Sequence, residues 1–178
     1  MNSRISALRF TIPLLLLATV PALGDDPQTC ERASGAAALV ACDRAIASGQ
    51  FAGIDLAKLH TNRGVERKRS GDLAGALADY SAAIRLNPAD PFAYNNRANT
   101  RRDMGDLPGA IADYGEALRV DPGYTAGYVN RGLLHERMGA LDLARADFRE
   151  AIGRPPKYQN GPGGQDLARR RLAELDRR

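Results

Sequence analysis

The stretch from Pro91 to Tyr124 is repeated along the chain at intervals of 34 residues. Shifting it by 34 residues in either direction finds copies of its pattern that begin at Ala57 and Thr125. A fixed period of this length is the signature of a repeat array, in which neighbouring copies bury each other's apolar faces. The sequence therefore predicts a stack of similar units, with full copies over 57–90, 91–124 and 125–158.

Five positions of the repeat hold the same kind of residue in all three copies. Positions 8 and 20 are small, so two helices can approach closely, and the aromatic residue at position 24 fills the space beyond them. Position 27 is alanine, and the proline at position 32 ends the second helix. Each copy is thus predicted to be two helices joined by a glycine-centred turn. In this order, the residues are Gly64, Ala98 and Gly132; Ala76, Ala110 and Ala144; Tyr80, Tyr114 and Phe148; Ala83, Ala117 and Ala151; and Pro88, Pro122 and Pro156.

This pattern resembles that of the tetratricopeptide repeat (TPR) family, W-x2-L-G-x2-Y followed by A-x3-F and P. The resemblance covers residues 57–158 and implies an all-α solenoid of helical hairpins that binds other protein chains. The Trp, Leu and Tyr sites of the family, at positions 4, 7 and 11, are mostly polar here, so the first helices are unusually polar. These sites hold His60, Tyr94 and Tyr128; Arg63, Arg97 and Arg131; and Arg67, Arg101 and His135.

The first 24 residues differ in composition from the rest of the chain. They begin with the basic residues Arg4 and Arg9, continue through an apolar run over 10–20 and contain no acidic residue. This order is typical of a secretory signal, and the run is shorter than the about 20 apolar residues of a spanning helix. We therefore predict a signal peptide over 1–24 and an exported, periplasmic protein without a stable membrane span. The alternatives are an uncleaved anchor and a misread start.

A partial copy of the repeat occupies residues 25–56, where one segment matches the second helix of the first repeat after a shift of 38 residues. This predicts an amino-terminal helical pair. It contains the two cysteines of the chain, Cys30 and Cys42, and such a pair in an exported chain predicts a disulfide. A straight helix would separate their Cα atoms by about 18 Å, whereas a disulfide needs about 7 Å or less. The chain is therefore expected to turn between them, near Gly35.

Residues 159–178 are predicted to hold a connector and a capping helix. The stretch 153–164 contains three prolines and four glycines, so it cannot form one helix. From Gln165 onward the apolar residues fall on one helical face. We interpret the arginines of this helix as a solvated outer face, the alternative being a site for anions or a membrane surface.

No motif of the sequence indicates catalysis, a metal or a cofactor. Its two histidines, His60 and His135, occupy repeat positions that the family uses for packing. There is no Walker sequence or zinc spacing, and a cysteine pair offers too few ligands for a structural metal. Without the first 24 residues the chain holds 23 basic and 21 acidic residues, which does not indicate nucleic-acid binding. We predict a protein that is not an enzyme and has no cofactor.

Two charged series recur once in each repeat, an arginine at position 7 of the first helix and an aspartate at position 23 of the second. A charged group at a site that the family fills with Leu needs a partner if it is buried. We therefore favour structural ion pairs over ligand binding, and the sequence leaves open whether they form within or between repeats. The predicted partners are Arg63 with Asp79, Arg97 with Asp113 and Arg131 with Asp147.

An asparagine recurs at position 6, on the face that lines the concave groove of the family. The series resembles the asparagine ladder in the repeat arm of the O-linked N-acetylglucosamine transferase, which implies that these amides hold an extended peptide. An amide is both donor and acceptor, so it can bind a peptide backbone whatever its sequence. The alternative is a row of solvated polar residues. The predicted groove residues are Asn62, Asn96 and Asn130, joined by Asn99, Lys68, Arg69 and Arg102.

The groove positions carry five basic and two acidic residues, so we expect the groove to favour acidic segments. Thr61 and Ala126 stand where the carboxylate clamp of chaperone-binding family members has basic residues, so a chaperone tail is not expected. The charged residues counted are Lys58, Lys68, Arg69, Arg102 and Arg137 against Asp103 and Glu136.

The sequence therefore predicts an exported scaffold that binds a peptide segment of an envelope protein in its concave groove. The rival prediction is a structural element that assembles with itself into a homo-oligomer. In that case its groove is filled by its own terminal helix. Neither prediction names the partner.

Overall fold

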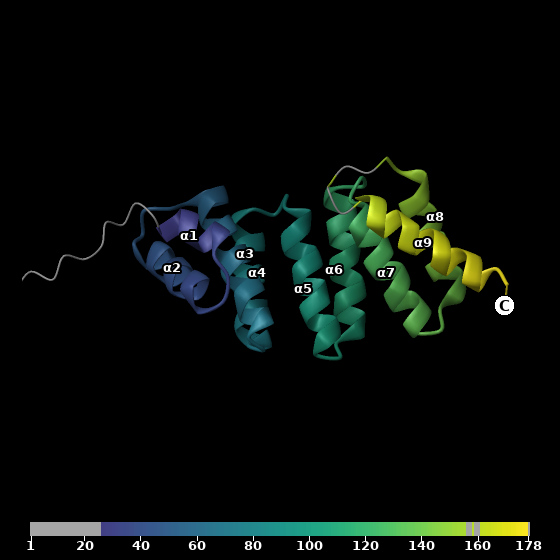
Figure 1. Cartoon of the computed structure of the whole chain (residues 1–178), viewed down its shortest axis with the longest axis horizontal. Coiled ribbons are helices and arrows are strands. Elements are labelled where there is room, and N and C mark those ends of the chain that lie inside the picture. Colours follow the sequence, from purple (N-terminus) through teal and green to yellow (C-terminus); the bar gives the residue numbers. More distant parts are fainter. Residues whose placement is uncertain (1–25, 156–157, 159–160, 178) are drawn as a thin grey trace, which may run out of the picture.

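The computed structural model describes residues 26–155, 158 and 161–177, so the predicted signal peptide lies outside the described residues. The described chain is all-α, and its helices stand side by side in an elongated solenoid, which confirms the predicted fold class (Figure 1). No helix in this part is long and apolar enough to cross a membrane. The helices are α1 (Asp26–Arg32), α2 (Ala36–Ala47), α3 (Gly53–Arg69), α4 (Leu73–Leu86), α5 (Pro91–Asp103), α6 (Leu107–Val120), α7 (Thr125–Arg137), α8 (Leu141–Gly153) and α9 (Gly161–Leu175).

Three helical hairpins, α3–α4, α5–α6 and α7–α8, form the body of the solenoid. Each hairpin turns at a glycine in the left-handed region, which glycine adopts without the steric cost of a Cβ atom. In the first hairpin the next residue, Asp72, caps α4 by accepting a hydrogen bond from the Gly75 N–H at 2.8 Å. Asp106 caps α6 in the same way. The turn glycines are Gly71, Gly105 and Gly139, with φ of 88°, 87° and 77°.

Position 8 of the repeat is small because an aromatic ring of the paired helix lies against it. A Cβ atom on Gly64 would lie 2.8 Å from the ring of Tyr80, and one on Gly132 would lie 2.8 Å from Phe148. These rings and the equivalent Tyr114 are completely or almost completely buried. The buried residues form a row of clusters between successive helices, so the solenoid has no single central core.

A disulfide joins the amino-terminal helical pair, α1 and α2. The sulfur atoms of Cys30 and Cys42 lie 2.07 Å apart and their Cα atoms 4.8 Å apart, which confirms the predicted bond. The chain turns between α1 and α2, where Gly35 has a φ of 67°. Both cysteines are buried in one cluster with Leu59 of α3, so the pair is packed onto the first repeat.

Glu66 of α3 provides a second link to this pair. Its buried side chain accepts a hydrogen bond from the backbone N–H of Gly35 at 2.7 Å. Gly35 is the N-cap of α2, so the carboxylate lies at the positive end of that helix dipole. Arg69, predicted as a groove residue, donates to the other oxygen of Glu66 at 2.6 Å.

The last helix, α9, packs against α7 and α8 at the carboxyl end of the solenoid (Figure 1). It begins at Gly161, four residues before the start that its apolar pattern predicted, because the first turn of a helix tolerates proline and glycine. The buried Gln165 amide donates to the carbonyl oxygens of Ala151 and Arg154, at 3.0 and 2.6 Å. At the other end, Arg145 of α8 donates to the Leu175 carbonyl at 2.7 Å. Both ends of α9 are thereby tied to the last hairpin.

Candidate functional site

A charged pair joins the two helices of each repeat. All three aspartates are buried, and each accepts hydrogen bonds from both Nε and Nη2 of its arginine. The structure thus places each pair within one repeat. The distances from Nη2 to Oδ1 are 2.6 Å for Arg63–Asp79, 2.7 Å for Arg97–Asp113 and 2.7 Å for Arg131–Asp147.

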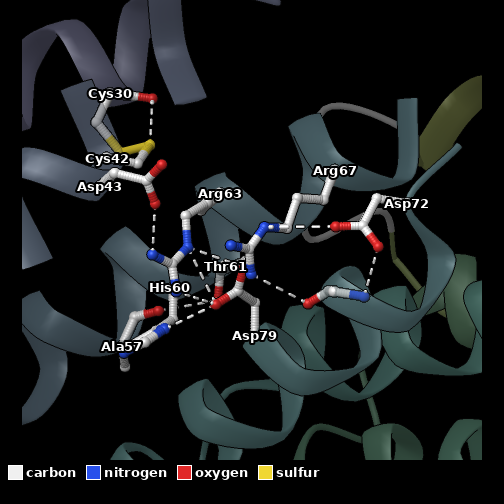
Figure 2. Close-up of polar contacts among 11 residues, drawn as sticks. Cys30, Cys42, Asp43, Ala57, His60, Thr61, Arg63, Arg67, Asp72 and Asp79 are labelled. Atoms are coloured by element: carbon white, nitrogen blue, oxygen red, sulfur yellow. Dashed lines mark hydrogen bonds and ion pairs between the residues drawn. A yellow bond between two sulfur atoms is a disulfide. The ribbon is translucent and has the colours of Figure 1, made fainter. Parts of the chain in front are cut away.

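The same arginines also contact the preceding hairpin. Arg63 Nη1 donates to Asp43 of α2 at 2.7 Å (Figure 2). Arg97 Nη1 donates to Ser81 of α4, at the equivalent site, at 3.2 Å. The equivalent residue in α6 is Gly115, which offers no side chain. One guanidinium therefore stabilises its own repeat and the interface with the previous one.

Further donors enclose each buried carboxylate. Asp79 lies 2.8 Å from Arg67 Nη1 and 3.0 Å from the His60 ring (Figure 2). Burial by itself would raise the pKa of Asp79, but hydrogen bonds from His60 and Arg63 and the nearby positive charges hold that pKa below its ordinary value. The aspartate is therefore a stably ionised structural group.

The other two repeats complete the arrangement with one residue each. Arg101 Nη1 lies 2.8 Å from Asp113, and the His135 ring lies 2.9 Å from Asp147. The residues that depart from the family at positions 7 and 11 thus contact one buried carboxylate in each repeat, and in the first repeat His60 at position 4 contacts it as well. Among the described residues, no three His, Cys, Asp or Glu side chains gather as a metal site would require.

The first helices of neighbouring repeats, and α7 with the capping helix α9, contact each other through side chains 35 residues apart, one more than the repeat length. Each contact therefore joins a residue to one that lies one position further along in the repeat numbering. A sequence aligned in repeats of 34 places these partners at different positions, so the contacts were not predicted. They are Asn95–Asn130 at 2.9 Å, Lys68–Asp103 at 2.9 Å and Glu136–Arg171 at 2.5 Å.

Two of the predicted groove asparagines are engaged in the framework of the protein. Asn130 donates from Nδ2 to Oδ1 of the buried Asn95. Asn99 accepts a hydrogen bond from the Tyr114 hydroxyl at 2.6 Å. Burial raises the pKa of Tyr114 to about 12, so its hydroxyl remains a donor at neutral pH.

The other two asparagines, Asn62 and Asn96, line a pocket of about 500 Å³ that we call the amino-terminal pocket. Positions 2 and 6 of the first and second repeats contribute to it, so it lies at the amino-terminal end of the groove face. Its α1 residues were not predicted, because α1 lies outside the repeat. The lining consists of Pro27, Gln28 and Glu31 of α1; Phe51; Asp55, Lys58, Leu59, Thr61, Asn62 and Val65 of α3; Asp90; and Phe92 and Asn96 of α5.

Acidic neighbours engage the basic residues predicted for the groove. Lys68 and Arg102 both contact Asp103, at 2.9 and 3.0 Å. Desolvation would raise the pKa of Asp103, but hydrogen bonds from these two residues lower it overall. Arg69 is held by Glu66. These charges are compensated locally, and the preference of the whole groove for acidic segments stays a prediction.

Three aromatic rings form an edge-to-face cluster next to the amino-terminal pocket. The Phe92 ring lies 5.2 Å from Tyr124 and 4.9 Å from Tyr158. The Tyr158 hydroxyl donates to Asp121 at 2.5 Å. Phe92, which lines the pocket and remains 38% exposed, is thus positioned by a residue that follows the last repeat hairpin.

The carboxyl-terminal end of the groove face is covered by α9. Val129, at position 5 of the third repeat, is buried in the same cluster as Ala168 of α9. A Cβ atom on Gly164 would lie 3.6 Å from the Val129 side chain. The open part of the groove face is therefore at the first two repeats.

Family models match two overlapping segments of the chain, a tetratricopeptide repeat model over 95–162 and a TPR repeat model over 64–101. Together they span more than half of the chain. No curated protein sequence matches it.

Solved structures share the fold. The first TPR of Spaghetti (RPAP3), bound to an HSP90 peptide, is 19% identical, with a TM-score of 0.61 over 72% of this chain and 97% of that one. The TPR2B domain of yeast Sti1 in complex with pHsp70 is 21% identical, with a TM-score of 0.61 over 68% and 96%. A tetratricopeptide repeat protein from Parabacteroides merdae is 24% identical, with a TM-score of 0.62 over 79% of this chain and 56% of that one. These structures share the fold of the chain, and the two family models, which together span residues 64–162, show that the chain belongs to the tetratricopeptide repeat family.

Proposed function

We propose that this protein is a non-enzymatic exported scaffold that holds an extended segment of an envelope protein in its groove. The amino-terminal pocket carries the proposal, because it joins the first two repeats and exposes an asparagine of each. Two proteins of the same fold support it: the Spaghetti domain is bound to an HSP90 peptide and the Sti1 domain forms a complex with pHsp70. Binding of another protein is also the general use of such concave repeat surfaces.

Asn62 and Asn96 are the proposed contacts to the main chain of the segment. Within the described part of the chain, neither side chain makes a hydrogen bond, and both are partly exposed in the pocket. An amide can donate to a peptide carbonyl and accept from a peptide N–H at the same time. Asn130 has a different role in this proposal, since it holds Asn95 in the framework. The proposed asparagine ladder therefore consists of Asn62 and Asn96.

An acidic side chain of the segment is proposed at one place only. Across neighbouring first helices, and between α7 and α9, the residues at positions 12 and 13 have opposite charges in Lys68–Asp103 and Glu136–Arg171. The same spacing relates Arg102 to Arg137, which are two like charges. A carboxylate from the partner would be attracted by both.

Export is part of the proposal. The order of residues in 1–24 supports it, and so does the buried disulfide, since such bonds persist in oxidising compartments. Amino-terminal sequencing of protein recovered from the periplasmic fraction should begin at Asp25. Recovery of an unprocessed chain from the cytoplasm alone would contradict export.

The groove is tested by site-specific photo-cross-linking in intact cells. A photoreactive side chain at Asn96 should link to the partner, whereas one at Arg85, exposed on α4, should not. Mass spectrometry then identifies the linked segment, which can be synthesised. Replacing both Asn62 and Asn96 by alanine should weaken its binding by about 5- to 150-fold, at about 0.5–1.5 kcal/mol for each hydrogen bond. Unchanged affinity in a variant with unaltered circular dichroism would refute the role of these amides.

Self-assembly is the second candidate, because α9 already covers the groove face at Val129 of its own chain. Exchange of α9 between two copies would fill the same site and create a dimer. Light scattering at several protein concentrations separates the candidates. A stable dimer that does not bind the cross-linked peptide supports assembly, and a monomer that binds it supports the scaffold.

A further inference from the structure

The wall that α1 adds to the amino-terminal pocket gives the pocket a chemistry that the repeats alone do not have. Pro27, Gln28 and Glu31 lie on the pocket side of α1, whereas Cys30 is buried and bonded to Cys42. Seven residues are too few for a helix to be stable alone in water. The disulfide and the packing around it therefore hold this wall in place against α3.

The pocket is acidic, although the groove positions of the sequence are basic overall. Its charged residues are Glu31, Asp55 and Asp90 against the single Lys58, a formal net charge of −2. Lys58 is paired with Asp55 at 3.3 Å, so its charge is already compensated. Within the described chain, Glu31 forms no ion pair.

Asp90 contributes a partly buried negative charge. It caps α5 by accepting a hydrogen bond from the Phe92 N–H at 2.9 Å. Burial nevertheless raises the pKa of Asp90, because the backbone hydrogen bonds offset only part of the desolvation. A cation bound near this carboxylate would stabilise its ionised form.

Apolar side chains complete the lining. Phe51 and Phe92 contribute aromatic side chains to the lining, and Phe92 is fixed by its contacts with two tyrosines. Aromatic faces attract cations and also pack against aliphatic chains. A long side chain with an apolar stem and a positive head fits both parts of such a lining.

We infer that the amino-terminal pocket receives a lysine or arginine side chain of the bound segment, followed or preceded by an apolar residue. The inference rests on the proposed function, because it assumes that the groove holds a peptide. It identifies the segment as basic where it passes α1. This preference is opposite to the acidic one expected from the groove residues of the sequence.

The probe is a pool of short random peptides passed over the immobilised, oxidised full-length protein, with the bound peptides eluted and sequenced. Enrichment of lysine or arginine next to apolar residues is expected. Enrichment of acidic peptides, or of peptides without a charge preference, would overturn the inference and leave the proposed function standing. Failure to retain any peptide above a blank column would overturn both.

A matched pair of variants locates the effect. Glu31→Gln should weaken binding of an enriched basic peptide by about 2- to 5-fold, the usual value of one partly exposed charge. Asp142→Asn changes a side chain on α8 that is 99% exposed, so it should leave the binding of this peptide unchanged. The loss in Glu31→Gln should shrink as salt rises, because salt screens exposed charges. If the two variants bind the peptide with the same affinity, whether unchanged or weakened, the assignment to this pocket is overturned.

Discussion

Asn130 donates a hydrogen bond to Asn95 across 2.9 Å, from α7 to α5, and the two residues are 35 apart in the chain. The bond joins the second and third repeats at the groove face. Asn95 is buried, so its amide oxygen depends on this partner for a hydrogen bond from a side chain. The contact has the same spacing as two ion pairs of the first helices, and it defines how one repeat sits on the next.

Asn95→Ala should destabilise the protein by about 0.5–1.5 kcal/mol, because it removes the hydrogen bond between repeats and leaves Asn130 without it. Asn96→Ala is the matched control. It changes the adjacent residue of the same helix, whose side chain lines the pocket, so the unfolding free energy should change little. Chemical denaturation measures both. A double-mutant cycle with Asn130→Ala should show coupling, and additive effects would contradict the contact.

Arg97→Leu should destabilise by about 3 kcal/mol, the lower end of the range for breaking a buried pair, because Arg101 still contacts Asp113. Replacing Arg97 and Asp113 together by leucine should recover much of this loss, since no buried charge then remains. Arg101 is 30% exposed and can turn toward solvent. Thermal and urea unfolding of the single and double variants would measure the recovery, and a double variant less stable than Arg97→Leu would contradict it.

Gly115 is equivalent to Asp43 and Ser81, whose side chains contact the position 7 arginine of the following repeat. Gly115 has no side chain that could contact Arg131. A Cβ atom there would lie 3.9 Å from Arg131 Nη1, so there is room for one. Gly115→Ala should stabilise α6 by about 0.5–1 kcal/mol through helix propensity. The free energy of unfolding of Gly115→Asp should exceed that of its neutral isostere Gly115→Asn by about 0.2–1 kcal/mol, because Asp43 makes the equivalent contact to Arg63 at 2.7 Å. That difference should decrease in high salt, and its absence in low salt would exclude a contact with Arg131.

Reduction of the disulfide should loosen α1 first. The bond closes a loop with a sequence separation of 12 residues, so its loss should cost about 3 kcal/mol in the chain-entropy account. Hydrogen exchange should accelerate in α1 and α2 after reduction, while α7 and α8 keep their protection, since repeats contact only their neighbours. A Cys30→Ser, Cys42→Ser variant should behave in the same way without reductant. Uniform acceleration along the whole chain would contradict a local role.

Acid should weaken the buried charge network of the first repeat. The pKa of Asp79 is lower in the folded chain than its ordinary value, so the unfolded state binds more protons as the pH falls. The stabilisation is complete above the ordinary aspartate pKa, near 4, and is lost as the pH falls toward the folded value. The unfolding free energies of the wild type and Asp79→Asn should therefore differ most near neutral pH and converge as the pH falls through the folded pKa of Asp79. A difference that does not change with pH would contradict this account.

Residue periodicity determined the structure inside each repeat. The small residue at Gly64 and the ring at Tyr80 meet because both positions recur in every copy and a close helix pair needs that combination of sizes. Arg97 and Asp113 recur together in the same way, and their side chains are in contact. The cysteine pair predicted its own disulfide, since only one pairing was available.

Contacts between repeats depend on the offset of one hairpin against the next, and a sequence of identical period does not contain that offset. Side-chain contacts one residue beyond the repeat period join Asn130 to Asn95 and Lys68 to Asp103, so two predicted groove residues are part of the framework. The charge of the groove face likewise depends on these contacts, because each charged residue must be counted with the neighbour that it meets.

The amino-terminal pocket was decided by tertiary structure alone. Glu31 and Phe92 are separated in sequence by the whole first repeat, and they line one pocket only because the disulfide-bonded hairpin folds back against α3. Tyr158 contacts Phe92 although the two residues are still further apart in the sequence. The sequence by itself determined that the protein is a TPR solenoid, because helix pairing within a repeat is local. The charge and shape of its open end depend also on segments outside the repeat, such as α1, whose positions are fixed by packing and not by periodicity.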